Sequence, residues 1–203
     1  MIIGICGKSG CGKSTLSRMI MEHHSDAIHL DIDKVGHYVL TLDEVKEELV
    51  NTFGPNVINE NLVNRKKLGE IVFNSRERMD RLTDITWKYM QIEIDKFLEA
   101  NKDKKVILDW LLLANTRYFD MCDLKILLDI PYEIRKHRAM LRDNITEEAF
   151  QLREKASIDY DADKFDHVIR GDQEIEVGKL VKSLWQKYYI QEVSIRLQKA
   201  IWI

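Results

Sequence analysis

The sequence predicts an α/β protein in three layers, in which helices flank a parallel five-stranded sheet. Short apolar runs alternate with loops or with longer segments of helical spacing, as expected for strands joined by crossover helices. The runs cover residues 1–6, 27–30, 106–108, 124–130 and 167–169. With two prolines and nine glycines in 203 residues, the chain has little linker material. The pattern predicts a single globular domain whose ligands bind beyond the carboxyl ends of the strands.

Charge and hydropathy argue against several classes of partner. The formal net charge of −3 provides no electrostatic reason to expect a nucleic-acid polymer. No apolar run approaches the length of a membrane span, and residues 1–6 are too short for a signal sequence. We therefore expect a cytoplasmic protein that binds a small molecule, with neither a nucleic acid nor a membrane as partner.

The first apolar run leads directly into a glycine-rich motif. Its residues are Gly7, Lys8, Ser9, Gly10, Cys11, Gly12, Lys13 and Ser14, followed by Thr15. The glycines let successive N–H groups point at phosphate oxygens beside the N-terminus of the next helix. We expect Lys13 to reach the β- and γ-phosphates and Ser14 to ligate Mg²⁺. This motif is a P-loop, so it predicts a P-loop NTPase fold that binds ATP and Mg²⁺.

The three cysteines follow no metal-ligand spacing. Cys6, Cys11 and Cys122 are odd in number, which indicates reduced thiols. Cys11 lies inside the P-loop near a helix N-terminus. That position should lower the pKa of its thiol and make it open to alkylation.

Two carboxylates follow the second apolar run. Asp31 and Asp33 are two residues apart, and in an extended segment such residues face the same way. One could then hold a Mg²⁺-bound water while the other accepts the proton of an acceptor hydroxyl. The alternative is that an Asp caps a helix before Lys34 and its partner is solvated.

Residues 42–103 are predicted to be a helical insertion that binds the acceptor. The apolar stripe of residues 42–50 indicates a helix, which Gly54 and Pro55 interrupt. A longer helical region follows. Because the segment lies between the second and third strands of the chain, it is in a position to serve as a substrate-binding arm.

Charged residues mark two places in this insertion. A basic cluster at 65–67 and a mixed-charge run at 76–81 indicate either a solvated helix face or contacts with the substrate. We expect Trp87, Tyr89 and Met90 to pack in the core rather than to contact a ligand.

The third apolar run ends in an acid, as a Walker B segment does. Asp109 would then act on Mg²⁺ through a water. Apolar strands that end in Asp are common, so this interpretation depends on the P-loop upstream.

Residues 135–162 are predicted to form a small lid. Arg135, Arg138 and Arg142 are three and four residues apart, which places them on one helix face as a candidate cationic clamp. Such arginines neutralise charge that develops on a transferred phosphoryl group. Arg153 could join them from the next helix. The alternative is a basic surface balanced by neighbouring acids, including Asp143.

The remaining segments form the predicted core, namely residues 1–41, 104–134 and 163–203. An apolar stripe at 180–188 predicts a helix that covers the sheet. The apolar end at 193–203 suggests docking on this chain or on a partner subunit, which fits a monomer or a small homo-oligomer.

With these features in place, residues 1 to about 172 resemble the dephospho-coenzyme A kinase family of P-loop kinases. The family's motifs beyond the P-loop are matched here by Asp31, Asp33 and His37; by Arg65, Leu68, Gly69, Val72 and Phe73; by Arg138, Arg142 and Asp143; and by Asp166, His167, Val168 and Ile169. The resemblance implies that Asp33 is the base that activates the ribose 3′-hydroxyl of dephospho-coenzyme A. It also implies that Arg138 and Arg142 contact ATP phosphates from the lid.

The chain departs from the family pattern where the acceptor is recognised. Thr86 and Trp87 replace a His-Pro pair, and residues 110–114 replace Pro-Leu-Leu-Phe-Glu. Ser157 replaces a glutamine and Arg170 an asparagine. Lys8 and Ser9 occupy P-loop positions where the family usually has Gly and an aliphatic residue.

The sequence thus predicts an ATP- and Mg²⁺-dependent kinase that phosphorylates a hydroxyl, with dephospho-coenzyme A as the leading acceptor. The altered positions keep a nucleoside or nucleoside-monophosphate kinase open as an alternative. A further alternative is not an enzyme at all but a module that binds a nucleotide without transfer activity. The intact Asp31 and Asp33 argue against it, because a module that only binds nucleotide needs no base.

Overall fold

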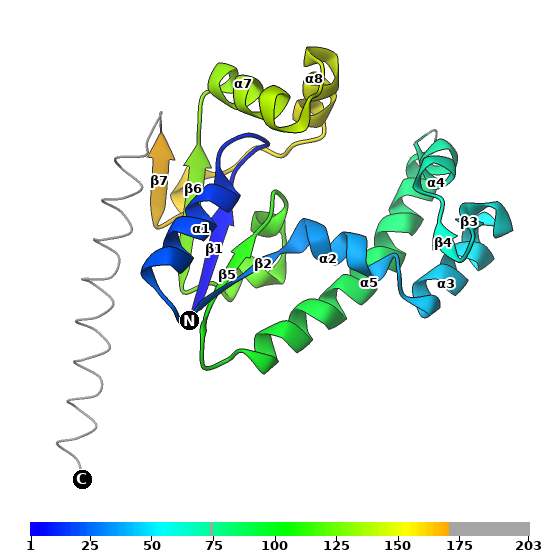
Figure 1. The fold of residues 1–203 in the computed structure, drawn as a ribbon, viewed down its shortest axis with the longest axis horizontal. Helices are drawn as coiled ribbons and strands as arrows, with labels where there is room; N and C mark the ends of the chain where they lie inside the picture. The colour runs from blue at the N-terminus through cyan, green and yellow to red at the C-terminus, as the bar shows by residue number, and fades with distance from the viewer. Residues whose placement is uncertain (74, 171–203) are drawn as a thin grey trace, which may run out of the picture. The chain divides into compact units, whose positions relative to one another are not determined.

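The computed structural model describes residues 1–73 and 75–170, and these form two compact units. Of the described residues, the first unit contains Met1–His29 and those from Lys104 to Arg170, and the second contains those within Leu30–Asp103. Figure 1 labels the elements of both units. The functional division into core, insertion and lid remains a prediction. In the structure, the second unit begins well before residue 42, where we expected the insertion to start.

The five predicted strands are all present and form one sheet. They are β1 (Ile2–Cys6), β2 (Ala27–Asp31), β5 (Lys105–Asp109), β6 (Leu124–Asp129) and β7 (His167–Arg170), in the order β2-β5-β1-β6-β7. β1 pairs in parallel with β5 on one side and with β6 on the other, and β6 pairs in parallel with β7. The predicted α/β fold with a parallel five-stranded sheet is therefore confirmed. The P-loop leaves β1 at the centre of this sheet, where ligands of such folds bind.

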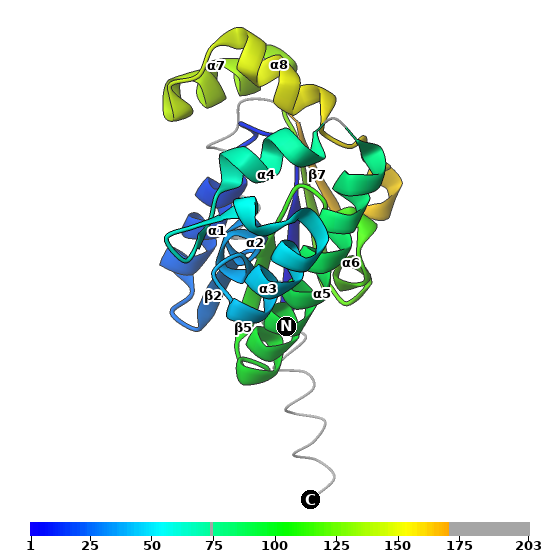
Figure 2. The same ribbon diagram turned by 90° about the vertical axis from the view of Figure 1, so that its right-hand side faces the viewer.

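Alternation along β1 directs side chains to the two faces of the sheet. Ile3 and Ile5 belong to a buried cluster with Leu16 and Ile20 of helix α1 (Lys13–His23). On the opposite face, a Cβ on Gly4 would lie 2.7 Å from the Cys122 sulfur, so the chain near helix α6 (Arg117–Asp120) packs directly against the strand. Figure 2 shows α1 and α6 on opposite sides of the sheet.

Two helices lie beyond the ends of β6 and β7 (Figures 1 and 2). They are α7 (Tyr132–Asp143) and α8 (Glu147–Lys155). Thr146 caps α8 by accepting a hydrogen bond from the Ala149 N–H, and the fully buried Phe150 packs edge-on against Tyr132 with ring centroids 5.5 Å apart. Short 3₁₀ turns at Leu113–Asn115 and Ala162–Lys164 complete the first unit.

The second unit is mostly helical. Its elements are α2 (Ile32–Val39), α3 (Asp43–Phe53), the 3₁₀ turn Pro55–Val57, the strands β3 (Ile58–Asn59) and β4 (Leu62–Val63), α4 (Arg65–Val72) and α5 (Arg76–Ala100). The 25-residue α5 packs against α2, α3 and α4 and buries Met90, Ile94 and Leu98.

The predictions for the side chains of this unit are confirmed in part. Met90 is buried as predicted, whereas Trp87 and Tyr89 are only half-buried, and the Tyr89 hydroxyl donates to Glu48 at 2.8 Å. The charged side chains of residues 76–81 are exposed, as expected for a solvated face. The antiparallel hairpin β3-β4 was not predicted. Its turn residues Glu60 and Asn61 have positive φ angles of 48° and 62°.

The predicted helix at 180–188 and the apolar end at 193–203 lie outside the described residues. Within the described part of the chain, no helix combines the length and apolar character that crossing a membrane requires.

Replacing a central core side chain tests this packing. Ile107 on β5 is fully buried, so Ile107→Ala should lower the free energy of unfolding by about 2–5 kcal/mol, measured by chemical denaturation. Leu141, which is 78% exposed on α7, provides the control, and Leu141→Ala should change stability by less than about 0.5 kcal/mol. Equal effects of the two substitutions would contradict the assigned core.

Candidate active site

The P-loop has the backbone shape that phosphate binding requires. Gly10 and Gly12 have φ angles of 79° and 99°, and α1 begins immediately afterwards at Lys13. A Cβ on Gly10 would lie 2.2 Å from the Arg135 carbonyl oxygen, so no larger residue fits there. The Lys13 ammonium donates to the Gly7 carbonyl at 2.9 Å. The loop thus joins a helix N-terminus, whose first N–H groups have no partners within the helix, to a nearby lysine.

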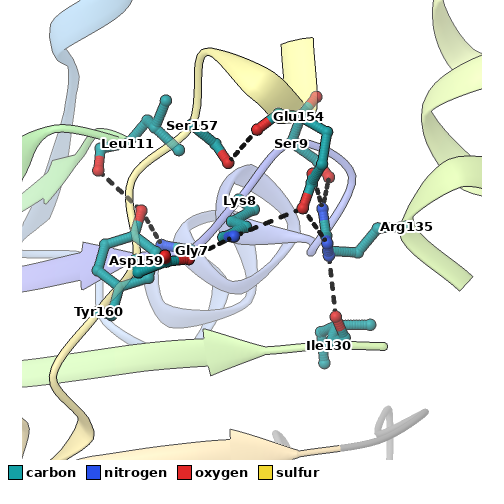
Figure 3. A network of polar contacts seen from close by, with 10 residues as sticks. All are labelled: Gly7, Lys8, Ser9, Leu111, Ile130, Arg135, Glu154, Ser157, Asp159 and Tyr160. Carbon is teal, nitrogen blue, oxygen red and sulfur yellow. Dashed lines mark hydrogen bonds and ion pairs between the residues drawn. The ribbon is translucent and has the colours of Figure 1, made fainter. Parts of the chain in front are cut away.

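Arg135 anchors this loop from inside the protein. The residue is 5% exposed, and its guanidinium donates to the carbonyl oxygens of Ile130 at 2.9 Å and Ser9 at 3.3 Å. It also forms a two-bond pair with the Glu154 carboxylate at 2.7 and 2.9 Å (Figure 3). This pairing lowers the pKa of Glu154. The prediction that Arg135 belongs to a phosphate clamp is therefore wrong, because its donors are already used inside the protein.

A second set of contacts ties the P-loop to the chain after α8. Lys8 pairs with Asp159 at 2.9 Å and with Glu154 at 3.5 Å. The Tyr160 hydroxyl accepts the Gly7 N–H at 3.2 Å and donates to the Leu111 carbonyl at 2.7 Å (Figure 3). Burial raises the pKa of Tyr160, so its hydroxyl keeps the proton that it donates. Glu154, Asp159 and Tyr160 were missed by the sequence reasoning, because no motif marks a residue whose role is to hold a loop.

A cavity of about 330 Å³ adjoins this network. Its lining includes Lys8, Leu127, Asp129, Tyr132, Arg135 and Tyr160. The cavity therefore lies between the P-loop and the carboxyl end of β6, within the first unit.

The other predicted clamp arginines lie on α7 and α8. Arg142 forms two hydrogen bonds with Asp143, at 2.7 and 2.9 Å, and Arg153 pairs with the same carboxylate. These partners hold the pKa of Asp143 well below its usual range. The Arg142 side chain is still 63% exposed, and Arg138 is half-buried. The acids near this helix thus balance part of its charge, as the alternative interpretation expected.

Asp109 lies at the end of β5, beside β1 and the start of α1. Its carboxylate is almost fully buried and accepts a hydrogen bond from the Ser14 hydroxyl at 3.1 Å. The structure therefore brings together two of the predicted metal ligands. No group of three or more His, Cys, Asp or Glu side chains able to hold a metal occurs in the described residues. The pair resembles sites where Mg²⁺ takes one or two protein oxygens and completes its shell with phosphates and water.

Asp31 and Asp33 differ from the expectation. Helix α2 begins at Ile32, so the two residues do not share an extended segment. Asp31 is instead the helix cap, with its side chain accepting a hydrogen bond from the Lys34 N–H at 3.3 Å. Asp33 is an exposed residue in the first turn of the helix. The capping alternative is confirmed for Asp31, and the argument that placed both carboxylates on one face was wrong.

Cys11 also differs from the expectation. Its side chain is 3% exposed, and its sulfur lies 2.5 Å from the position that a Cβ on Gly7 would occupy. Burial raises the pKa of this thiol instead of lowering it. The expected lowering of its pKa is therefore wrong, and its burial argues against the expected reactivity toward alkylating agents. All three cysteines are free thiols, as predicted.

Comparison with known proteins identifies the family. The family model for dephospho-CoA kinase matches residues 1–176. The chain belongs to the dephospho-CoA kinase family. It is 35% identical over 191 residues to the dephospho-CoA kinase of Aquifex aeolicus, covering 91% of this chain and 96% of that protein. It is 30% identical over 179 residues to the dephospho-CoA kinase of Fusobacterium nucleatum, and this match covers 87% of this chain and 92% of that protein.

A crystal structure of a Thermus thermophilus protein has the same fold. Its TM-score is 0.77 at 23% sequence identity, and the match covers 92% of this chain and 97% of that one. The family model and the two relatives confirm the resemblance to the dephospho-CoA kinase family.

Several departures from the family pattern take part in the network around the P-loop, and the Lys8 and Ser9 contacts described above are among them. Ser157, at the position of the family's glutamine, donates to the Glu154 carbonyl at 2.7 Å. Leu111, in the altered segment 110–114, provides the carbonyl that binds Tyr160. Lys8 and Ser157 act through their side chains, whereas Leu111 contributes a backbone carbonyl that any residue would supply.

The Arg135–Glu154 pair predicts a specific pH dependence of stability. Because the pKa of Glu154 is lowered in the folded protein, the pair stabilises the fold above the unfolded pKa of about 4.3, and this stability is lost as the pH falls through the folded pKa. Glu154→Gln should lower the free energy of unfolding by about 1.5–3 kcal/mol at neutral pH. The difference in free energy of unfolding between Glu154→Gln and the unsubstituted protein should become smaller in acid.

Denaturant titrations over a range of pH measure this difference. Glu133 pairs with Lys136 but is 76% exposed, so Glu133→Gln should have little effect at any pH. A stability loss in Glu154→Gln that stays constant down to acidic pH would contradict the assigned ion pair.

Proposed function

We propose that this protein transfers the γ-phosphoryl group of ATP to the ribose 3′-hydroxyl of dephospho-CoA, giving CoA and ADP. The observation that carries the proposal is a preformed P-loop whose Ser14 contacts Asp109, in a chain that belongs to the dephospho-CoA kinase family. A nucleotide-binding module without transfer activity would not explain why an acid at the acceptor side, Asp33, is present as well.

The P-loop residues would bind the phosphates of ATP. The loop from Gly7 through Thr15 would wrap around the phosphates and offer them backbone N–H groups other than those of Gly7 and Cys11, which bond to Tyr160 and Lys8. The Lys13 ammonium would exchange its bond to the Gly7 carbonyl for oxygens of the β- and γ-phosphates. Ser14 and Asp109 supply hard oxygen donors of the kind that Mg²⁺ prefers. When bound, Mg²⁺ would neutralise charge on the phosphate oxygens.

Asp33 would act as the general base, as its match to the family motif implies. It accepts the proton of the 3′-hydroxyl, the hydroxyl oxygen bonds to the γ-phosphorus, and the bond from that phosphorus to the bridging oxygen of ADP breaks. Arg138 and Arg142 would neutralise charge on the transferred group. Asp31 would act on the cation only through water, because its side chain caps α2.

The setting of the reaction follows from the same proposal. The substrates are small molecules, and we propose that the protein works in the cytoplasm as a monomer or a small homo-oligomer.

Release of ADP from Mg²⁺-ATP, measured with different acceptors, tests the proposal. Dephospho-CoA should stimulate release, whereas a panel of nucleosides and nucleoside monophosphates should not. Stimulation by a nucleoside or a nucleoside monophosphate instead would show that this compound, and not dephospho-CoA, is the acceptor. Measurable ATP binding with no stimulation by any acceptor would contradict the assigned activity.

Replacing the proposed base separates catalysis from binding. Asp33→Asn should lower turnover at least about a hundredfold, because the base is lost, and should leave ATP affinity within a few-fold. Asp84 is exposed on α5, and Asp84→Asn is the matched control, expected to keep full turnover. Unchanged turnover in Asp33→Asn would show that Asp33 is not the base.

A further inference from the structure

A histidine that belongs to no motif faces the candidate metal site. His29 lies on β2 in the first unit, and its side chain is 16% exposed. Its Nε2 atom is buried and lies 3.4 Å from Oδ2 of Asp109. Within residues 1–73 and 75–170, this nitrogen has no hydrogen-bond partner. A buried polar atom without a partner costs free energy, so its position beside a candidate metal ligand calls for an explanation.

Asp109 needs more than one donor to stay in place. The same Oδ2 that faces His29 accepts the hydrogen bond from Ser14. A carboxylate held by a single donor can still rotate about its Cβ–Cγ bond, whereas a second donor restricts that rotation. Side chains that contact metal ligands from behind orient those ligands and strengthen metal binding in this way.

We infer that His29 is a positioning residue for Asp109. In its neutral form with the proton on Nε2, the imidazole donates to Asp109 Oδ2 and holds the carboxylate beside Ser14. The present separation of 3.4 Å is slightly long for this bond, and hydrogen bonds in catalytic sites commonly tighten when the ligands bind. His29 thereby increases the affinity for Mg²⁺ with nucleotide without contacting either one. The inference rests on the proposed function only in assuming that Mg²⁺ and a nucleotide bind at Ser14 and Asp109.

The alternative is that the imidazole only fills space between β2 and β5. A space-filling role would affect stability or nucleotide affinity regardless of metal. A positioning role affects only the gain in affinity that Mg²⁺ provides. This difference makes the two roles separable by experiment.

The test is calorimetric binding of ADP to the full chain, with Mg²⁺ and with EDTA. The Mg²⁺-dependent gain in ADP affinity should fall about tenfold or more in His29→Leu, while affinity in EDTA stays within about twofold. His29→Gln, which keeps an N–H donor, should retain most of the gain. In an Asp109→Asn background, His29→Leu should cause little further loss, because the two residues act together.

A second histidine provides the matched control. His167 is half-buried on β7 at an edge of the same sheet, and His167→Leu should leave the Mg²⁺-dependent gain unchanged. An unchanged gain in His29→Leu would overturn the inference and leave the proposed function standing, as would an equal loss with Mg²⁺ and with EDTA. Failure of the unsubstituted protein to bind ADP with Mg²⁺ would instead overturn the proposed function, and the role of His29 with it.

Discussion

The buried guanidinium of Arg135 is the constraint on which the site depends. It joins the P-loop at Ser9, the chain after β6 at Ile130, and helix α8 at Glu154. Removing a charge from water costs several kcal/mol unless the charge is paired and hydrogen-bonded, so these three segments must stay together for the fold to be stable. The same contacts hold the loop that we propose binds phosphate. One buried side chain therefore contributes both to the stability of the fold and to the shape of the P-loop.

The sheet could be predicted from the sequence because each strand is a short apolar run, and the P-loop because its glycines have fixed spacing. Other elements leave weaker signals. The hairpin β3-β4 has strands of two residues, too short to show an alternating pattern. Helix α2 begins directly at the end of β2, so Asp31 and Asp33 looked like an extended pair although Asp31 is a helix cap.

The errors at Arg135 and Cys11 have a common physical cause, which is burial. Spacing correctly predicted that Arg135 lies on a helix, but its partner Glu154 is 19 residues away and no local pattern reveals it. For Cys11, the favourable effect of a helix N-terminus on the thiolate is smaller than the cost of burying that charge, so the pKa rises. His29 also leaves no local pattern in the sequence, because only the packing of β2 near β5 brings it close to Asp109.

The fate of the γ-phosphoryl group of ATP tests the central claim most directly. The protein would be incubated with dephospho-CoA and ATP that is labelled in this group, and the position of the label in the products would be determined by mass spectrometry. The account predicts that the product is identical to CoA and that its labelled phosphoryl group is attached to the ribose 3′-oxygen. Label found only in inorganic phosphate, or on a different oxygen of the acceptor, would contradict it.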